Sequence, residues 1–139
     1  MLEKKIDQYL ETHILTTPKP KLLLMLLEKI ISLCQESKQY LEQTDYENLN
    51  NKLQQAQNIL IELINALSET LDEKISKNLK NLYLFSFRQL VLANLEKDRE
   101  KIDGVEKIIS IIYDGFKKSL EKENGGVNKM EGSSINVER

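Results

Sequence analysis

The sequence has 139 residues, which is enough for one domain with a single hydrophobic core and argues against two domains. Its 20 basic and 22 acidic residues nearly cancel and are interspersed, so no basic face favours a nucleic acid or an anionic membrane as partner. The longest apolar run, from Leu22 to Leu27, is far shorter than the roughly 20 residues that span a bilayer, and no signal segment opens the chain. We therefore expect a cytoplasmic protein without stable membrane insertion.

Residues 1–17 form an N-terminal segment with its own pattern. A short amphipathic helix is predicted over residues 1–11, where apolar side chains recur at helical spacing at Leu2, Ile6, Tyr9 and Leu10. Such a helix is too short to be stable alone. It either docks on the rest of the protein as a displaceable lid or stays disordered. Thr12 to Thr17 has no helical pattern and leads into Pro18, a helix-start signal.

Residues 18–120 are predicted to form an all-α domain. Both prolines precede residue 21 and all five glycines follow residue 103, so the stretch between them lacks the usual helix breakers. Apolar side chains at three- and four-residue spacing predict four helices, at about Lys19 to Glu42, Tyr46 to Ser68, a third centred on Ile75 to Asn94, and Asp98 to Leu120. Because the connectors are short, consecutive helices must run antiparallel, which predicts an up-down-up-down four-helix bundle.

A polar, unpatterned tail follows the predicted bundle. Residues 121–139 contain glycine and serine and show no helical spacing of apolar side chains. Segments of this composition do not bury enough apolar surface to offset the loss of chain entropy on folding. We expect this C-terminal tail to be disordered.

The helix from Ile75 to Asn94 is apolar around most of its circumference. Leu84, Phe85 and Leu92 fall outside its narrow seam, so one neighbouring helix could not cover all of its apolar surface. Two interpretations remain open. The helix is central to the bundle, or it reserves a face for a partner.

The sequence offers little for catalysis. Its one histidine, His13, lies in the first connector, and its one cysteine, Cys34, lies on the apolar face of a helix, with no third group to orient a nucleophile. No set of histidines, cysteines and carboxylates has metal-ligand spacing, and no Gly-rich phosphate-binding loop precedes a helix. We expect a binding or structural protein that is not an enzyme and needs no cofactor.

Two runs of residues resemble one family, the flagellar secretion chaperones called FliS. Residues 55–63, QAQNILIEL, resemble the family's (K/Q)AQ(N/D)II-x-EL run, and residues 78–94, NLKNLYLFSFRQLVLAN, resemble its NL-x-x-LY-x-Y-x-Y-R-x-L-(I/V)-x-AN helix. The interval between the runs also agrees. Elsewhere the chain departs from the family, with Leu27-Glu28-Lys29 in place of YDG or YNG, and YDGF at residues 113–116 in place of RDAW.

The resemblance implies a cytoplasmic bundle that binds the C-terminal segment of flagellin, prevents its premature polymerisation and assists its delivery to the gate of the flagellar type III export apparatus. It implies a monomer or weak dimer without a cofactor. The predicted client-binding residues are Ile6, Tyr9, Leu10, Asn78, Tyr83, Phe87, Ala93 and Asn94. For Tyr83 and Phe87 the competing interpretation is plain core packing. The alternative function is a self-associating scaffold or regulatory subunit with no flagellin role.

Overall fold

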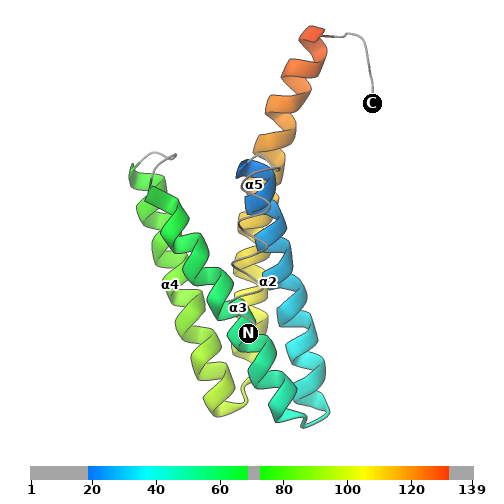
Figure 1. Ribbon diagram of the computed structural model, residues 1–139, viewed down its shortest axis with the longest axis vertical. Helices are drawn as coiled ribbons and strands as arrows, with labels where there is room; N and C mark the ends of the chain where they lie inside the picture. Colours follow the sequence, from blue (N-terminus) through cyan, green and yellow to red (C-terminus); the bar gives the residue numbers. More distant parts are fainter. Residues whose placement is uncertain (1–18, 69–72, 132–139) are drawn as a thin grey trace.

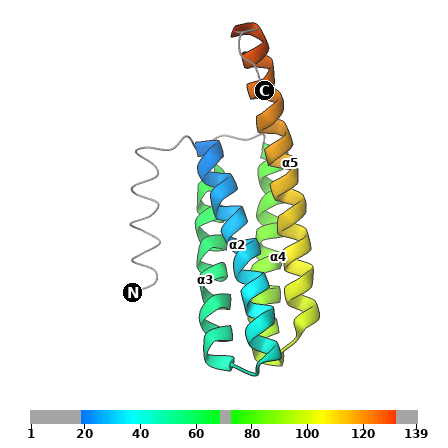
Figure 2. The same ribbon diagram turned by 90° about the vertical axis from the view of Figure 1, so that its right-hand side faces the viewer.

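The computed structural model describes residues 19–68 and 73–131, which form helices joined by short connections. Figures 1 and 2 show the long helices running side by side, with α5 extending past the ends of the others. The elements are α2 (Lys19–Glu42), α3 (Tyr46–Asn65), the 3₁₀ turn η1 (Ala66–Ser68), α4 (Glu73–Glu96) and α5 (Arg99–Glu131). None of the described helices combines the length and apolar character needed to cross a bilayer.

The four long helices form a closed ring of neighbours. α2 packs against α3 and α5, and α4 packs against the same two helices, whereas α2 and α4 make no direct contact across the described residues. Each helix runs antiparallel to the one before it (Figure 2). The predicted all-α, up-down-up-down bundle is confirmed, and α2 and α4 lie diagonally opposite each other.

Local sequence signals fix two of the connections. The side chain of Asp45 accepts a hydrogen bond from the backbone N–H of Asn48 at 3.2 Å, which satisfies one of the free donors at the start of α3. Asp98 does the same for the N–H of Glu100 at 2.9 Å at the start of α5. Thr44 and Lys97 adopt positive φ angles of 53° and 56°, and these left-handed residues end α2 and α4 and reverse the chain.

One hydrophobic core runs through the bundle, and every helix contributes to it. Its fully or nearly fully buried apolar residues are Leu22, Leu26, Leu27, Ile30, Leu33 and Cys34 of α2, Leu49, Leu53, Ala56, Ile59, Leu60 and Leu63 of α3, Leu79, Tyr83, Leu90 and Ala93 of α4, and Ile102, Val105, Ile109 and Ile112 of α5. The buried residues of α3 recur at intervals of three or four, as the sequence pattern predicted, and Ile59 is one additional buried residue beside Leu60.

The last helix is longer than the sequence pattern predicted. We expected it to end near Leu120, but α5 continues to Glu131 and includes the first part of the predicted tail. Once a helix has formed, each further residue adds a backbone hydrogen bond without a new nucleation cost, so polar residues can extend it. The predicted N-terminal segment 1–17 and the last part of the tail, 132–139, lie outside the described residues.

Candidate binding surface

Helix α4 has two different faces. Its buried residues, Leu79, Tyr83, Ser86, Leu90 and Ala93, are three or four positions apart and face the core. Large apolar side chains on the rest of the helix remain exposed: Ile75 (49 % exposed), Leu82 (39 %), Phe85 (46 %), Leu92 (37 %) and Leu95 (74 %). We call these five residues the α4 outer face. They account for most of the large exposed apolar side chains in the described part of the chain.

Two hydrogen bonds establish the direction of this outer face. The Ser76 hydroxyl donates to the backbone carbonyl of Leu67 at 3.1 Å, and the Asn94 amide donates to the side-chain oxygen of Asn50 at 2.7 Å, so Ser76 and Asn94 mark the side of α4 that faces α3. Phe85 lies nine residues from each of them. Nine residues correspond to about two and a half helical turns, so Phe85 points away from α3.

The charged side chains of α4 are mostly of one sign. Between its terminal residues Glu73 and Glu96, every charged side chain is basic, namely Lys74, Lys77, Lys80 and Arg88. All four are exposed. The apolar outer face of α4 is therefore interspersed with basic side chains of the same helix, although the whole chain carries a formal net charge of −2.

The structure places the predicted client-binding residues in different environments. Tyr83 is 1 % exposed and Ala93 is fully buried, so both pack in the core, and Phe87 is partly buried against it. Asn94 makes the contact with Asn50 described above and also accepts from the Lys97 ammonium at 3.1 Å, while Asn78 is exposed. Ile6, Tyr9 and Leu10 lie outside the described residues. Contact of these eight residues with a client stays a prediction.

Sequence reasoning did not assign the outer face to binding. It noted that Phe85 and Leu92 fall outside the seam but did not include them, Leu82 or Leu95 among the candidate contacts. A signal was present, because Leu82, Phe85 and Leu92 are three and seven residues apart and so share one side of the helix. The helix therefore carries a second apolar stripe beside its core stripe.

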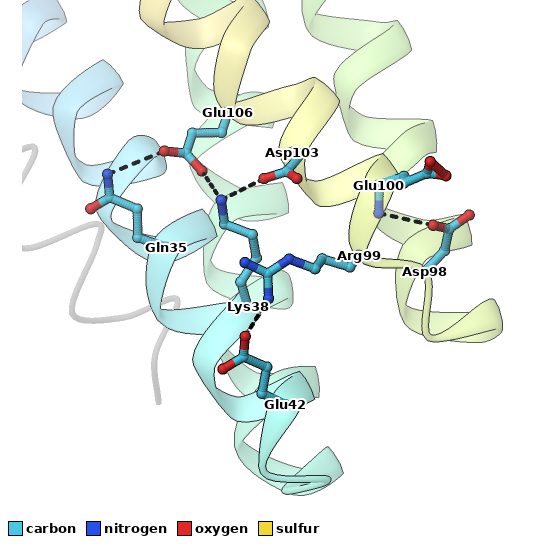
Figure 3. A network of polar contacts seen from close by, with 8 residues as sticks. All are labelled: Gln35, Lys38, Glu42, Asp98, Arg99, Glu100, Asp103 and Glu106. Carbon is cyan, nitrogen blue, oxygen red and sulfur yellow. Dashed lines mark hydrogen bonds and ion pairs between the residues drawn. The ribbon is translucent and has the colours of Figure 1, made fainter.

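Helix α2 is held to α5 by polar contacts that Figure 3 shows at close range. The Lys38 ammonium lies between two carboxylates of α5, pairing with Asp103 and, at 2.7 Å, with Glu106. The hydrogen bonds that the Lys38 ammonium donates to the two carboxylates raise the pKa of Lys38, and the one accepted by Asp103 lowers the pKa of Asp103. Further along, Arg99 pairs with Glu42 at 2.8 Å. These ion pairs tie α2 to α5.

Two titratable groups lie in the core. Burial raises the pKa of the Cys34 thiol from 9.0 to about 12, so the thiol is neutral and a poor nucleophile at neutral pH. Burial also raises the pKa of Tyr83 to about 12, and its hydroxyl has no hydrogen-bond partner among the described residues. Both groups act as core residues in this structure.

Comparison with known proteins identifies the family. The family model described as "Flagellar protein FliS" matches residues 2–124, which is nearly the whole chain. The chain belongs to the FliS family. Similar FliS proteins, each named flagellar secretion chaperone, are found in Bacillus subtilis (strain 168), at 28 % identity over 88 % of this chain and 90 % of the relative, and in Salmonella typhimurium, at 30 % identity over 81 % and 84 %.

The FliS fold is also found in a solved structure. A crystal structure described as a flagellar chaperone from bacteria superimposes with a TM-score of 0.72, covering 86 % of this chain and 97 % of the other. Its sequence identity to this chain is 18 %. The two proteins therefore share the bundle fold despite their low sequence identity.

Proposed function

We propose that this FliS-family protein is a cytoplasmic flagellin export chaperone that acts by binding and not by catalysis. It binds the C-terminal segment of flagellin, prevents premature polymerisation and assists delivery to the flagellar type III export apparatus. Membership of the family supports a chaperone role in flagellar export, because the curated relatives are named flagellar secretion chaperones.

The observation that carries the proposal is the uncovered outer face of α4. Soluble monomers rarely leave large contiguous apolar surface without a function. Here Leu82, Phe85 and Leu92 follow one side of a straight helix, a spacing that suits the apolar stripe of a partner helix. An amphipathic client that folds on this surface loses chain entropy, so it needs a long apolar contact to bind.

The predicted contact residues take two roles in this proposal. Asn78 is exposed on the same side of α4 as Leu82, four residues further on, and contacts the client directly. Tyr83 and Ala93 pack beneath the outer face and fix the position of α4, as do Phe87 and the hydrogen bond of Asn94.

A double substitution on the outer face tests the proposal. Leu82→Ser with Phe85→Ser removes exposed apolar surface without opening the core, so affinity for a synthetic flagellin C-terminal peptide should fall about 100-fold, with each residue contributing about tenfold. Isothermal titration calorimetry measures the affinity, and thermal unfolding checks that the fold is kept. Ile111→Ser, at a side chain of α5 that is 72 % exposed, is the matched control and should bind normally. Unchanged affinity in the double variant would contradict the proposal.

Ile6, Tyr9 and Leu10 belong to the proposed lid. If the segment lies over the client surface in the free protein, it competes with flagellin, and deletion of residues 1–17 should tighten binding of the same peptide. Unchanged affinity after the deletion would remove the lid from the account while leaving the client surface in place.

The alternative function, a self-associating scaffold or regulatory subunit, uses the same exposed apolar surface differently. It requires stable oligomers of the protein alone, whereas the chaperone is proposed to be a monomer or a weak dimer. Sedimentation velocity at several concentrations, with and without the flagellin peptide, separates the two. Concentration-independent oligomers that ignore the peptide would favour the scaffold.

A further inference from the structure

The charge beside the α4 outer face is a second feature that a purely apolar binding surface does not need. Lys77, Lys80 and Arg88 are exposed, and none has an ion-pair partner among the residues that the structure describes. By contrast, the exposed Arg99 of α5 is paired with Glu42 at 2.8 Å. Lys77, Lys80 and Arg88 are thus available to a partner.

These cations are interleaved with the apolar side chains. Lys77, Asn81, Phe85, Arg88, Leu92 and Leu95 follow one another at intervals of three or four residues and form a continuous row along the exposed side of α4. Lys77 and Arg88 are eleven residues apart, which is close to three full turns and places them on the same side, about 16 Å apart along the axis. Any helix lying on Phe85 and Leu92 therefore passes both cations.

We propose that the α4 outer face takes an amphipathic protein helix that carries acidic residues beside its apolar stripe. This inference rests on the proposed function and adds a charge rule to it. Under this rule, apolar contact supplies most of the affinity, and Lys77 and Arg88 select helices with acidic flanks. Opposite charges across the contact favour the correct partner and speed its association, and basic flanks are rejected by repulsion.

The same charges disfavour two other occupants. A second copy of this chain, placed face to face on α4, would bring Lys77 and Arg88 against the same cations of its partner, because α4 has no acidic residue between its ends. An anionic membrane is typically recognised through larger basic clusters, and the net charge of this protein is −2. A helical protein segment with acidic flanks fits better than either.

The test uses the full chain and two synthetic helical peptides that share one leucine stripe and differ only in having glutamate or lysine beside it. At low salt the wild-type protein should bind the glutamate peptide at least about tenfold more tightly than the lysine peptide, and the preference should shrink as salt screens the charges. The variant Lys77→Glu with Arg88→Glu should reverse the preference. The control Lys21→Glu with Lys29→Glu makes the same charge change at exposed positions of α2, diagonally opposite, and should leave the preference unchanged.

Equal binding of the two peptides would overturn the charge rule. A membrane-binding result would also overturn it. In that case the wild-type protein would bind vesicles of phosphatidylcholine and phosphatidylglycerol but would not discriminate between the peptides, and Lys77→Glu with Arg88→Glu would abolish vesicle binding. If the flagellin C-terminal peptide binds and the double charge reversal does not weaken it, the charge rule fails and the chaperone proposal stands. If the glutamate peptide is preferred but the flagellin peptide does not bind, the charge rule stands and the chaperone proposal fails.

Discussion

Helices α2 and α4 lie diagonally opposite each other and have similar apolar content, yet they differ in how much of this apolar surface is exposed. The sequence pattern of α2 is widened beyond its seam by Leu24, Leu27 and Ile31, just as that of α4 is widened by Phe85 and Leu92. In the structure, Leu27 is fully buried, and no large apolar side chain of α2 is among the strongly exposed ones of the described chain. On α4, Phe85 and Leu92 stay 46 % and 37 % exposed.

The difference arises from the neighbours of each helix. Ion pairs of Lys38 and Glu42 hold α2 against α5, whereas the ion pair between α5 and α4, from Lys101 to Glu96 at 3.1 Å, lies at the turn that connects them. A broad apolar circumference on a helix therefore does not by itself predict burial. It becomes core where neighbours close over it and a binding surface where they do not.

The largest expected effect contrasts one leucine from each helix. Leu27→Ala leaves a cavity in the closed core and should lower the free energy of unfolding by about 2–5 kcal/mol. Leu95→Ala removes a side chain that is 74 % exposed and should change it by less than about 0.5 kcal/mol. Urea denaturation measures both. Equal losses would mean that the outer face of α4 is covered in solution.

A smaller effect is expected from the polar network of α2. In Lys38→Met, Asp103 and Glu106 lose their shared cation and face each other, which should lower the free energy of unfolding by about 1–2 kcal/mol. The comparison is Lys77→Met on α4, where no such pair exists among the described residues and stability should hardly change. A destabilisation by Lys77→Met as large as that by Lys38→Met would show that α4 is also anchored by charge.

Tyr83 lies on the core-facing side of α4. Its buried hydroxyl has no partner among the described residues, so Tyr83→Phe removes an unsatisfied polar group and should raise the free energy of unfolding by about 1 kcal/mol. Tyr83→Ala serves as the opposite control, because loss of the ring opens the core. A destabilising Tyr83→Phe would show that the hydroxyl finds a hydrogen bond in solution.

Alkaline pH should give the smallest effect. Burial raises the pKa of Cys34 from 9.0 to about 12 and that of Tyr83 from 10.0 to about 12, so the unfolded chain loses these protons first. Stability is therefore complete below pH 9 and is lost progressively as pH rises toward 12. The variant Cys34→Ala with Tyr83→Phe should lose less stability over this interval in denaturation experiments, and an identical pH slope would contradict the assignment.

Much of the fold could be predicted from spacing and turn residues alone. The bounds of α2 agree with the prediction from Lys19 to Glu42, and α3 begins at Tyr46 as predicted, directly after its cap Asp45. The end of α5 at Glu131 could not be predicted, because it lies in a polar segment that is helical only as a continuation of the preceding helix. The spacing of apolar residues also could not show which of them remain exposed on α4, because this depends on how closely α3 and α5 pack against that helix. The run at residues 78–94 that resembles the family's helix contains both core residues, such as Tyr83, and exposed ones, such as Phe85.

The client surface on α4 is tested by NMR on the full chain, in which backbone amides and side-chain methyl groups are followed during titration with the flagellin C-terminal peptide. If the client binds as proposed, the largest shifts should occur at Leu82, Phe85 and Leu92 of α4, with little change at Lys21 and Lys29 on the exposed side of α2. Shifts concentrated on α2, with the outer face of α4 unaffected, would contradict the proposal.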